Sequence, residues 1–168
     1  NSGADNFTDV ALAGGCAVNS TGTPEAGMGV QWVDVNQDGW FDLFMTHIRR
    51  ETNTFYMNRK GRFRDMTNMT GLGPDSVRVT GFGMGFHDFN LDGQLDLYIA
   101  NGAVQAWGRE ESYGDDPYAE PNLLYQGLGG TRFECLGEGT ASPVLGSSRG
   151  AAFGDIDNDG DVDVVVVD

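Results

Sequence analysis

The chain has 168 residues, enough for one domain with a buried core. Its 25 acidic and 10 basic residues give a formal charge of −15, which argues against a nucleic-acid partner because the chain would repel a polyanion. No run of about 18 apolar residues occurs, so the sequence predicts no membrane-spanning helix.

The predicted elements repeat along the chain. Three segments align without gaps: Gly27–His47, Gly81–Asn101 and Ser148–Asp168. In each, an acidic loop is enclosed by short runs rich in β-branched and aromatic residues, such as 29–33 and 41–45, which are typical of β-strands.

A second pattern lies between the aligned segments. Asn53–Gly73 matches Asn122–Ser142, and Asn6–Gly15 matches its second half. It predicts two further strands around a tight turn that contains Gly61. Four short strands in each unit of about 55–65 residues are typical of a β-propeller blade, and no ten-residue stretch has convincing helical periodicity.

We therefore expect an all-β fold of about three four-stranded blades. Residues 1–25 end one blade, 26–80 and 81–147 form two units, and 148–168 begin another. The second unit carries about fifteen extra residues in one loop, which lengthens the spacing of the repeats.

The acidic loops share the pattern D-x-[DN]-x-D-G-x-x-D. Positions one, three, five, seven and nine are Asp34, Asn36, Asp38, Trp40 and Asp42; Asp88, Asn90, Asp92, Gln94 and Asp96; and Asp155, Asp157, Asp159, Asp161 and Asp163. Ca²⁺ takes six to eight oxygen ligands, which closely spaced carboxylates and amides supply. Glycine at position six allows the chain to wrap around an ion, and the variable seventh residue is expected to coordinate through its backbone carbonyl. The pattern predicts about three calcium ions.

Other interpretations of these loops were weighed. An EF-hand needs Glu at position twelve, where the three loops carry Met45, Ile99 and Val166. Mg²⁺ prefers octahedral sites that keep several waters, and neither histidine falls in a zinc-type cluster. The alternative is a turn whose Asp and Asn side chains only cap backbone groups. Three calcium ions carry +6 and would reduce the formal charge of −15 to −9, so folding is expected to depend on metal.

The spacing of glycines, acidic loop, N-x-L-Y and G-x-F-x-D-x-T resembles the FG-GAP (VCBS-type) repeat, and looks most like the ASPIC/UnbV-type bacterial relatives of cartilage acidic protein. The resemblance runs from about Phe7 to Asp168. It implies an integrin-alpha-like, roughly seven-bladed propeller with calcium in its loops. It also implies a secreted, periplasmic or cell-surface module that binds rather than catalyses.

Several residues outside the loops are also candidates. The insert 102–121 carries Trp107, Tyr113 and Tyr118, aromatic residues common in recognition surfaces, although a solvated variable loop is the alternative. His87 is expected to pack between blades and His47 to face a loop surface. Six of the ten basic residues fall in 49–64 and are expected to pair with acidic loops of a neighbouring blade. Cys16 and Cys135 could pair, and sequons begin at Asn6, Asn19 and Asn68.

The sequence thus predicts a calcium-binding extracellular module for protein or glycan binding, without enzymatic activity. One alternative is a structural subunit of a surface or filament assembly, in which other chains or segments complete the propeller. Another is part of a propeller lyase or hydrolase, for which His87 is the candidate residue.

Overall fold

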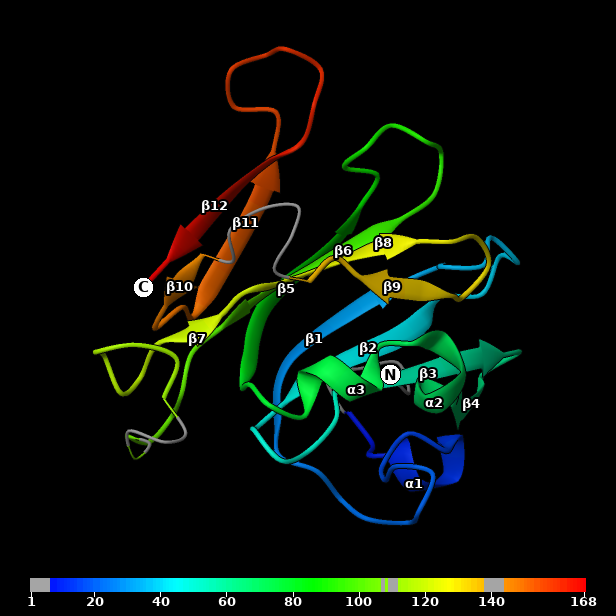
Figure 1. Ribbon diagram of the computed structural model, residues 1–168. Helices are drawn as coiled ribbons and strands as arrows, with labels where there is room; N and C mark the ends of the chain where they lie inside the picture. Colours follow the sequence, from blue (N-terminus) through cyan, green and yellow to red (C-terminus); the bar gives the residue numbers. More distant parts are fainter. Residues whose placement is uncertain (1–6, 107, 109–111, 138–143) are drawn as a thin grey trace.

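The computed structural model describes residues 7–106, 108, 112–137 and 144–168 (Figure 1). This part of the chain is built from antiparallel β-sheets that lie side by side in an open row and do not close into a ring. The all-β fold predicted from the repeats is confirmed. No helix within the described ranges is long and apolar enough to cross a membrane.

The first sheet contains four strands in sequence order, as the blade pattern predicted. They are β1 (Gly27–Val33), β2 (Asp42–His47), β3 (Thr54–Arg59) and β4 (Arg62–Asp65). The β3–β4 turn consists of Lys60 and Gly61, and both have positive φ, at 58° and 83°. A two-residue turn of this kind matches the twist of a hairpin, so Arg59 pairs directly with Arg62.

The second sheet repeats the first in the order β5-β6-β8-β9. Its strands are β5 (Gly81–His87), β6 (Asp96–Asn101), β8 (Leu123–Gly127) and β9 (Phe133–Cys135). The predicted insert separates β6 from β8, and β7 (Glu120–Pro121) within it pairs with β10 (Leu145–Gly146). A two-stranded sheet of β11 (Gly150–Gly154) and β12 (Asp163–Val167) follows.

Neighbouring sheets pack face to face through aromatic side chains. Phe86 of the second sheet lies 5.5 Å from Phe44 of the first and 5.8 Å from Phe133, with the rings edge to face. These rings belong to a buried core that includes Phe55 and Tyr125, both fully buried. The core therefore lies between the first and second sheets.

The first strands of adjacent sheets approach each other closely at glycines. A Cβ atom on Gly29 would collide with the carbonyl oxygen of Phe82, and one on Gly83 would collide with the backbone of Gly150 and Ala151. Gly29 and Gly83 hold equivalent positions in the repeat. The G-x-G part of the pattern is therefore explained by the contact between sheets.

Three four-residue helices were not anticipated by the sequence analysis. They are α1 (Ala11–Gly14), α2 (Thr67–Thr70) and α3 (Gly73–Ser76). α1 and α2 occupy equivalent positions, and the glycine that ends each one, Gly15 or Gly71, packs against the carbonyl of Phe63 or Phe133 in the next outer strand. The segment expected to be a glycine-rich link is thus a helical turn that covers the adjacent sheet.

Candidate metal centre

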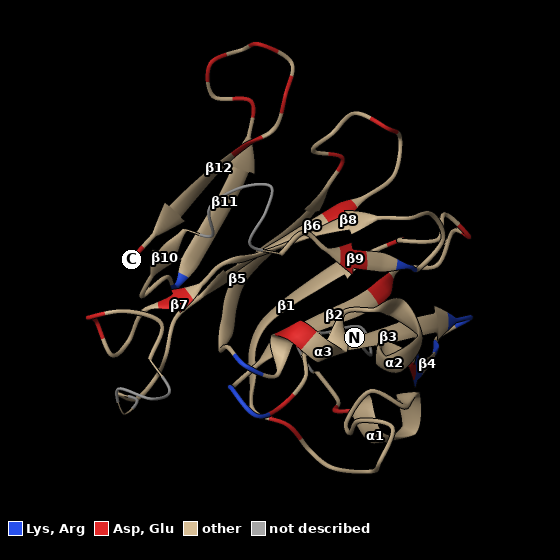
Figure 2. Cartoon of the chain, in the orientation of Figure 1, with Lys and Arg blue, Asp and Glu red and all other residues tan. Residues whose placement is uncertain are grey.

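The three acidic loops extend from the same ends of the sheets. Each connects the first two strands of its sheet: β1 to β2, β5 to β6, and β11 to β12. Figure 2 shows their acidic residues at the tips of these connections, away from the bodies of the sheets. All three loops therefore hold the same place between the first two strands of their sheets.

Side chains of each loop organise its backbone. In the second loop, Oδ1 of Asp88 accepts the N–H of Asp92 at 3.0 Å, and Oδ2 accepts the N–H of Gly93 at 2.8 Å. Oδ1 of Asp92 in turn accepts the N–H of Gln94 at 2.8 Å. The same three bonds recur in the first loop, where Asp34 accepts the N–H groups of Asp38 and Gly39, and Asp38 accepts that of Trp40. In the third loop Asp155 accepts the N–H groups of Asp159 and Gly160, and Asp159 accepts that of Asp161.

This geometry requires two residues with left-handed backbone in each loop. The sixth position is Gly39, Gly93 or Gly160, with φ of 85°, 86° and 99°. The fourth position also has positive φ although it is not glycine: 56° at Gln37, 59° at Leu91 and 65° at Asn158. Such strain at non-glycine residues is uncommon, and its recurrence shows that the loop conformation is a property of the motif.

The ninth residue of the first and second loops fastens the loop to the third strand of its sheet. Oδ2 of Asp96 accepts the N–H of Phe89 at 3.0 Å, and Oδ1 accepts the N–H of Gly127 in β8 at 2.8 Å. Asp42 makes the equivalent bonds with Val35 and Asn58, at 3.4 and 2.8 Å. Burial raises the pKa of the Asp42 carboxyl, and bonds from Asn58 and Val35 oppose that rise.

The third loop brings three carboxylates together. Oxygens of Asp155, Asp157 and Asp159 lie within 4.8 Å of one another, and all three side chains are exposed. The fourth carboxylate expected there, Asp163, accepts the N–H of Ile156 at 2.8 Å and lies outside this group. All of these atoms are hard oxygen donors, which fit a cation of the Ca²⁺ type.

The first two loops have an amide in the third position. Asn90 Oδ1 accepts the N–H of Asp92 at 2.9 Å, and Asn90 Nδ2 donates to Asp92 Oδ2 at 3.0 Å. Asn36 and Asp38 make the same pair of bonds, both at 3.1 Å. These loops therefore bring positions one, three and five together, with one carboxylate fewer than the third loop.

At the opposite ends of the sheets, a glutamate and an asparagine hold the loop before the third strand. Asn122 Oδ1 accepts the N–H of Asn101 at 2.7 Å, and Oε2 of the fully buried Glu120 accepts the N–H of Thr80 at 2.6 Å. In the first sheet the same bonds join Asn53 to His47 at 2.9 Å and Glu51 to Ala26 at 2.7 Å. The sequence analysis missed the glutamates. Their signal is the recurrence of E-x-N in ETNTFY and EPNLLY.

His47 lies in this second cluster and is 2% exposed. Its Nε2 is 3.9 Å from Glu25, its Nδ1 is 3.8 Å from Glu51, and neither nitrogen has a hydrogen-bond partner among the described residues. Burial lowers the pKa of His47, and the carboxylates of Glu25 and Glu51 oppose that change. The expectation that His47 faces a loop surface is wrong, because the side chain is buried.

His87 packs between sheets. Its ring lies 4.9 Å from that of Phe153 in the third sheet and 5.8 Å from that of Phe89. Burial lowers the pKa of His87. This placement agrees with the packing role predicted for it.

The aromatic residues of the insert fall into two groups. Tyr113 is 40% exposed, has the Arg49 guanidinium 5.9 Å from its ring centre, and lines a hollow of about 430 Å³ together with Arg78 and Leu145. Tyr118 is 44% exposed and does not line that hollow. Trp107 lies outside the described residues, as does the sequon at Asn6.

Other sequence predictions concern cysteines and basic residues. Cys16 and Cys135 are both free thiols, and burial raises the pKa of Cys135 to about 11. Arg49 lies 3.7 Å from Glu120, which belongs to the loop before the third strand of its sheet rather than to an acidic loop.

Four-stranded antiparallel sheets that carry an acidic loop after the first strand are typical of blades in propeller-type repeat proteins. Comparison with known proteins gives one such family. Residues 34–99 match the family model described as FG-GAP-like repeat. The first and second acidic loops and the strands around them thus resemble an FG-GAP-like repeat.

One curated protein shares the pattern over nearly all of the chain. The chain is 27% identical over 174 residues to cartilage acidic protein 1 of Xenopus tropicalis, a match that covers 99% of this chain. The chain spans about a quarter of the length of that relative, 24%.

Proposed function

We propose that the chain is a calcium-binding part of an extracellular β-propeller that binds a protein or glycan and has no catalytic activity. The recurrence of one loop geometry in three acidic loops carries the calcium part of the proposal. Positions one, three and five supply converging oxygens, position seven supplies a carbonyl, and position nine joins the shell after a small rearrangement. When bound, each ion screens the mutual repulsion of these carboxylates.

The extracellular binding role is supported by the FG-GAP-like repeat and by the similarity to cartilage acidic protein 1. The enzyme alternative has less support, because its candidate residue His87 is occupied by packing against Phe153. The other histidine, His47, is buried beside Glu25 and Glu51.

A second candidate role is completion of the propeller by further sheets. Trp32 is 57% exposed, although Phe86 at the equivalent position is buried against the first sheet. At the other end of the row Val165 is 45% exposed, whereas its equivalent Tyr98 packs against Phe153. The face of the first sheet that carries Trp32 and the face of the third sheet that carries Val165 are thus exposed, although the equivalent faces of the second sheet are covered by neighbouring sheets. We propose that further blades cover these two faces.

The calcium proposal is tested by a matched pair of substitutions in the third loop. Asp159→Asn removes a converging carboxylate, whereas Asp161→Asn removes the same charge from an exposed residue expected to coordinate only through its carbonyl. We expect Asp159→Asn to weaken calcium binding to this loop at least about tenfold, and Asp161→Asn to change it less than about threefold. Isothermal titration calorimetry of the full chain measures both.

Thermal unfolding gives a second readout. At a free calcium concentration about 100 times the dissociation constant, one site stabilises the fold by about 2.7 kcal/mol, so EGTA should lower the melting temperature clearly. Equal effects of the two substitutions, or melting curves that coincide with and without EGTA, contradict the assignment. Mg²⁺ at the same concentration is expected to restore little of the shift.

A further inference from the structure

The hairpin formed by β3 and β4 gathers positive charge in a chain of formal charge −15. Arg59, Lys60, Arg62 and Arg64 are four of its ten basic residues. Figure 2 shows Lys and Arg gathered at this hairpin. At physiological ionic strength charges are screened over about 8 Å, so a local patch can attract an anion despite the net charge of the chain.

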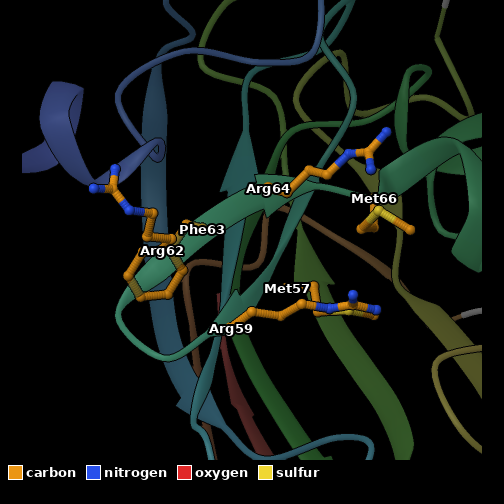
Figure 3. A pocket seen from close by; sticks show the side chains of 6 residues that line it. All are labelled: Met57, Arg59, Arg62, Phe63, Arg64 and Met66. Carbon is orange, nitrogen blue, oxygen red and sulfur yellow. The ribbon is translucent and has the colours of Figure 1, made fainter.

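A hollow of about 250 Å³ lies at this cluster. It is lined by Met57, Arg59, Arg62, Phe63, Arg64 and Met66. In Figure 3, Arg59 and Arg64 extend toward the side on which Met66 lies, and Arg62 extends away from them. The hollow therefore combines guanidinium groups with an apolar floor.

The register of the hairpin places like charges opposite each other. Arg59 pairs directly with Arg62, and Met57 pairs with Arg64, so these side chains start from one face of the sheet. Like charges at directly paired positions destabilise a sheet. Among the described residues, no carboxylate forms an ion pair with Arg59, Arg62 or Arg64.

The blade architecture does not require this charge. In the second sheet the positions of Arg59 and Arg64 are held by Leu128 and Glu134, and the hairpin still forms. An arrangement that costs stability and is absent from the equivalent hairpin calls for a purpose other than folding.

We propose that the β3–β4 groove binds a polyanionic polysaccharide through its sulfate or carboxylate groups. Arginine binds such groups with two parallel hydrogen bonds, and its guanidinium is weakly hydrated enough to pack on apolar surface. The hollow is smaller than the roughly 300–1,000 Å³ of sites for drug-sized ligands, so it fits one charged unit of a polymer. Successive units then reach Arg62 and Lys60 at the rim.

A folded acidic protein is the poorer fit. Protein interfaces bury about 800 Å² on each partner around aromatic anchors, whereas this surface offers Met57 and Met66 between the arginines. The ring of Phe63 packs on the other face of the hairpin, against Trp32. Addition of an acidic strand to β4 is also disfavoured, because Gly15 already lies against the outward carbonyl of Phe63. The inference rests on the proposed binding role but not on the calcium sites.

Biolayer interferometry with immobilised polymers tests the groove on the full chain in the presence of calcium. The probes are heparin, polygalacturonate, neutral dextran, poly-L-glutamate and duplex DNA. We expect binding to heparin or polygalacturonate, none to dextran, and affinity that falls as salt rises. Arg59→Gln and Arg64→Gln should each weaken binding about five- to tenfold.

Arg132→Gln is the matched control, because Arg132 holds the position of Arg62 in the second sheet. It should change binding less than about twofold. Absence of binding to both anionic glycans, or an equal effect of Arg132→Gln, overturns the proposal. Affinity for poly-L-glutamate equal to that for the anionic glycans would indicate an acidic protein partner instead. Affinity for DNA equal to that for the glycans would indicate unselective attraction between charges. Either result also overturns the polysaccharide proposal.

The calcium-dependent melting shift is measured on the same variants. We expect all three to retain it and to melt no lower than the parent, since removal of Arg59 relieves the repulsion with Arg62. If the parent chain shows the melting shift but binds neither anionic glycan, the groove proposal alone is contradicted. If the parent chain binds a glycan but shows no melting shift, the calcium proposal alone is contradicted.

Discussion

Replacement of Gly83 by alanine should separate the second and third sheets. A Cβ atom at this position would lie 2.8 Å from the carbonyl carbon of Gly150 and closer still to the nitrogen of Ala151. Ordinary contact of a Cβ begins at about 3.4 Å, so β11 must move by at least about 0.6 Å. The obstructing atoms belong to the backbone, so a change of side-chain rotamer cannot relieve the clash.

The movement also weakens the interactions that join the two sheets. The N–H of Gly83 donates to the carbonyl of Arg149 at 3.2 Å, and the ring of Phe153 packs against His87. Overpacking of this kind typically costs about 1–3 kcal/mol, and the lost hydrogen bond adds about 1 kcal/mol. We expect Gly83→Ala to lower the free energy of unfolding by about 2–4 kcal/mol.

Gly154→Ala is the control for this experiment. Gly154 ends β11, its φ is not positive, and a Cβ there would meet nothing within 4 Å. Urea unfolding followed by circular dichroism in saturating calcium should place it within about 0.5 kcal/mol of the parent. If the two substitutions have the same effect, the close approach of the sheets is not the reason for glycine at this position.

Two further predictions concern the ends of the sheets that lie away from the acidic loops. Asn122→Ala should lower the free energy of unfolding by about 1–3 kcal/mol, because it leaves the buried N–H of Asn101 without an acceptor. The control is Asn68→Ala at an exposed position, which should lower it by less than about 0.5 kcal/mol. Urea unfolding measures both variants. Because the pKa of His47 is lower in the folded state than its ordinary value near 6.5, the unfolded chain binds more protons, and stability should fall as pH drops below about 6.5. His47→Asn places at this position the residue that the second sheet has there, Asn101. In calcium-saturated thermal melts between pH 5 and 8, this variant should lose less stability on acidification than the parent. A parent chain that becomes more stable on acidification contradicts the argument.

The features of the fold that a sequence can predict are those that repeat. The acidic loops and the four-strand unit recur along the chain, and the structure places them and the hairpin at Lys60–Gly61 as expected. Equivalent positions also predicted the role of His87, since Val33 and Gly154 replace it and a catalytic group would not be exchanged so freely.

The features that the sequence did not predict have physical reasons of their own. α1 and α2 are four residues long, too short to show a helical period, and are ended by glycines that pack on the next sheet. Glu120 falls within the insert 102–121, for which a solvated loop was the alternative, yet it is fully buried with a backbone N–H as its partner. The burial of such a carboxylate depends on the tertiary contact, which spacing alone does not reveal.

The carboxylates of this chain accept backbone N–H groups as much as they offer ligands. Asp88 and Asp96 bond the second loop to itself and to β8, and Glu120 and Glu51 do the same at the opposite ends of the sheets. These backbone hydrogen bonds do not need an ion, so we expect them to hold part of the loop shape when calcium is removed. EGTA should therefore lower the melting temperature without unfolding the chain at 25 °C. A chain that loses its β-sheet circular dichroism on removal of calcium would show instead that these backbone hydrogen bonds are too weak to hold the loops alone.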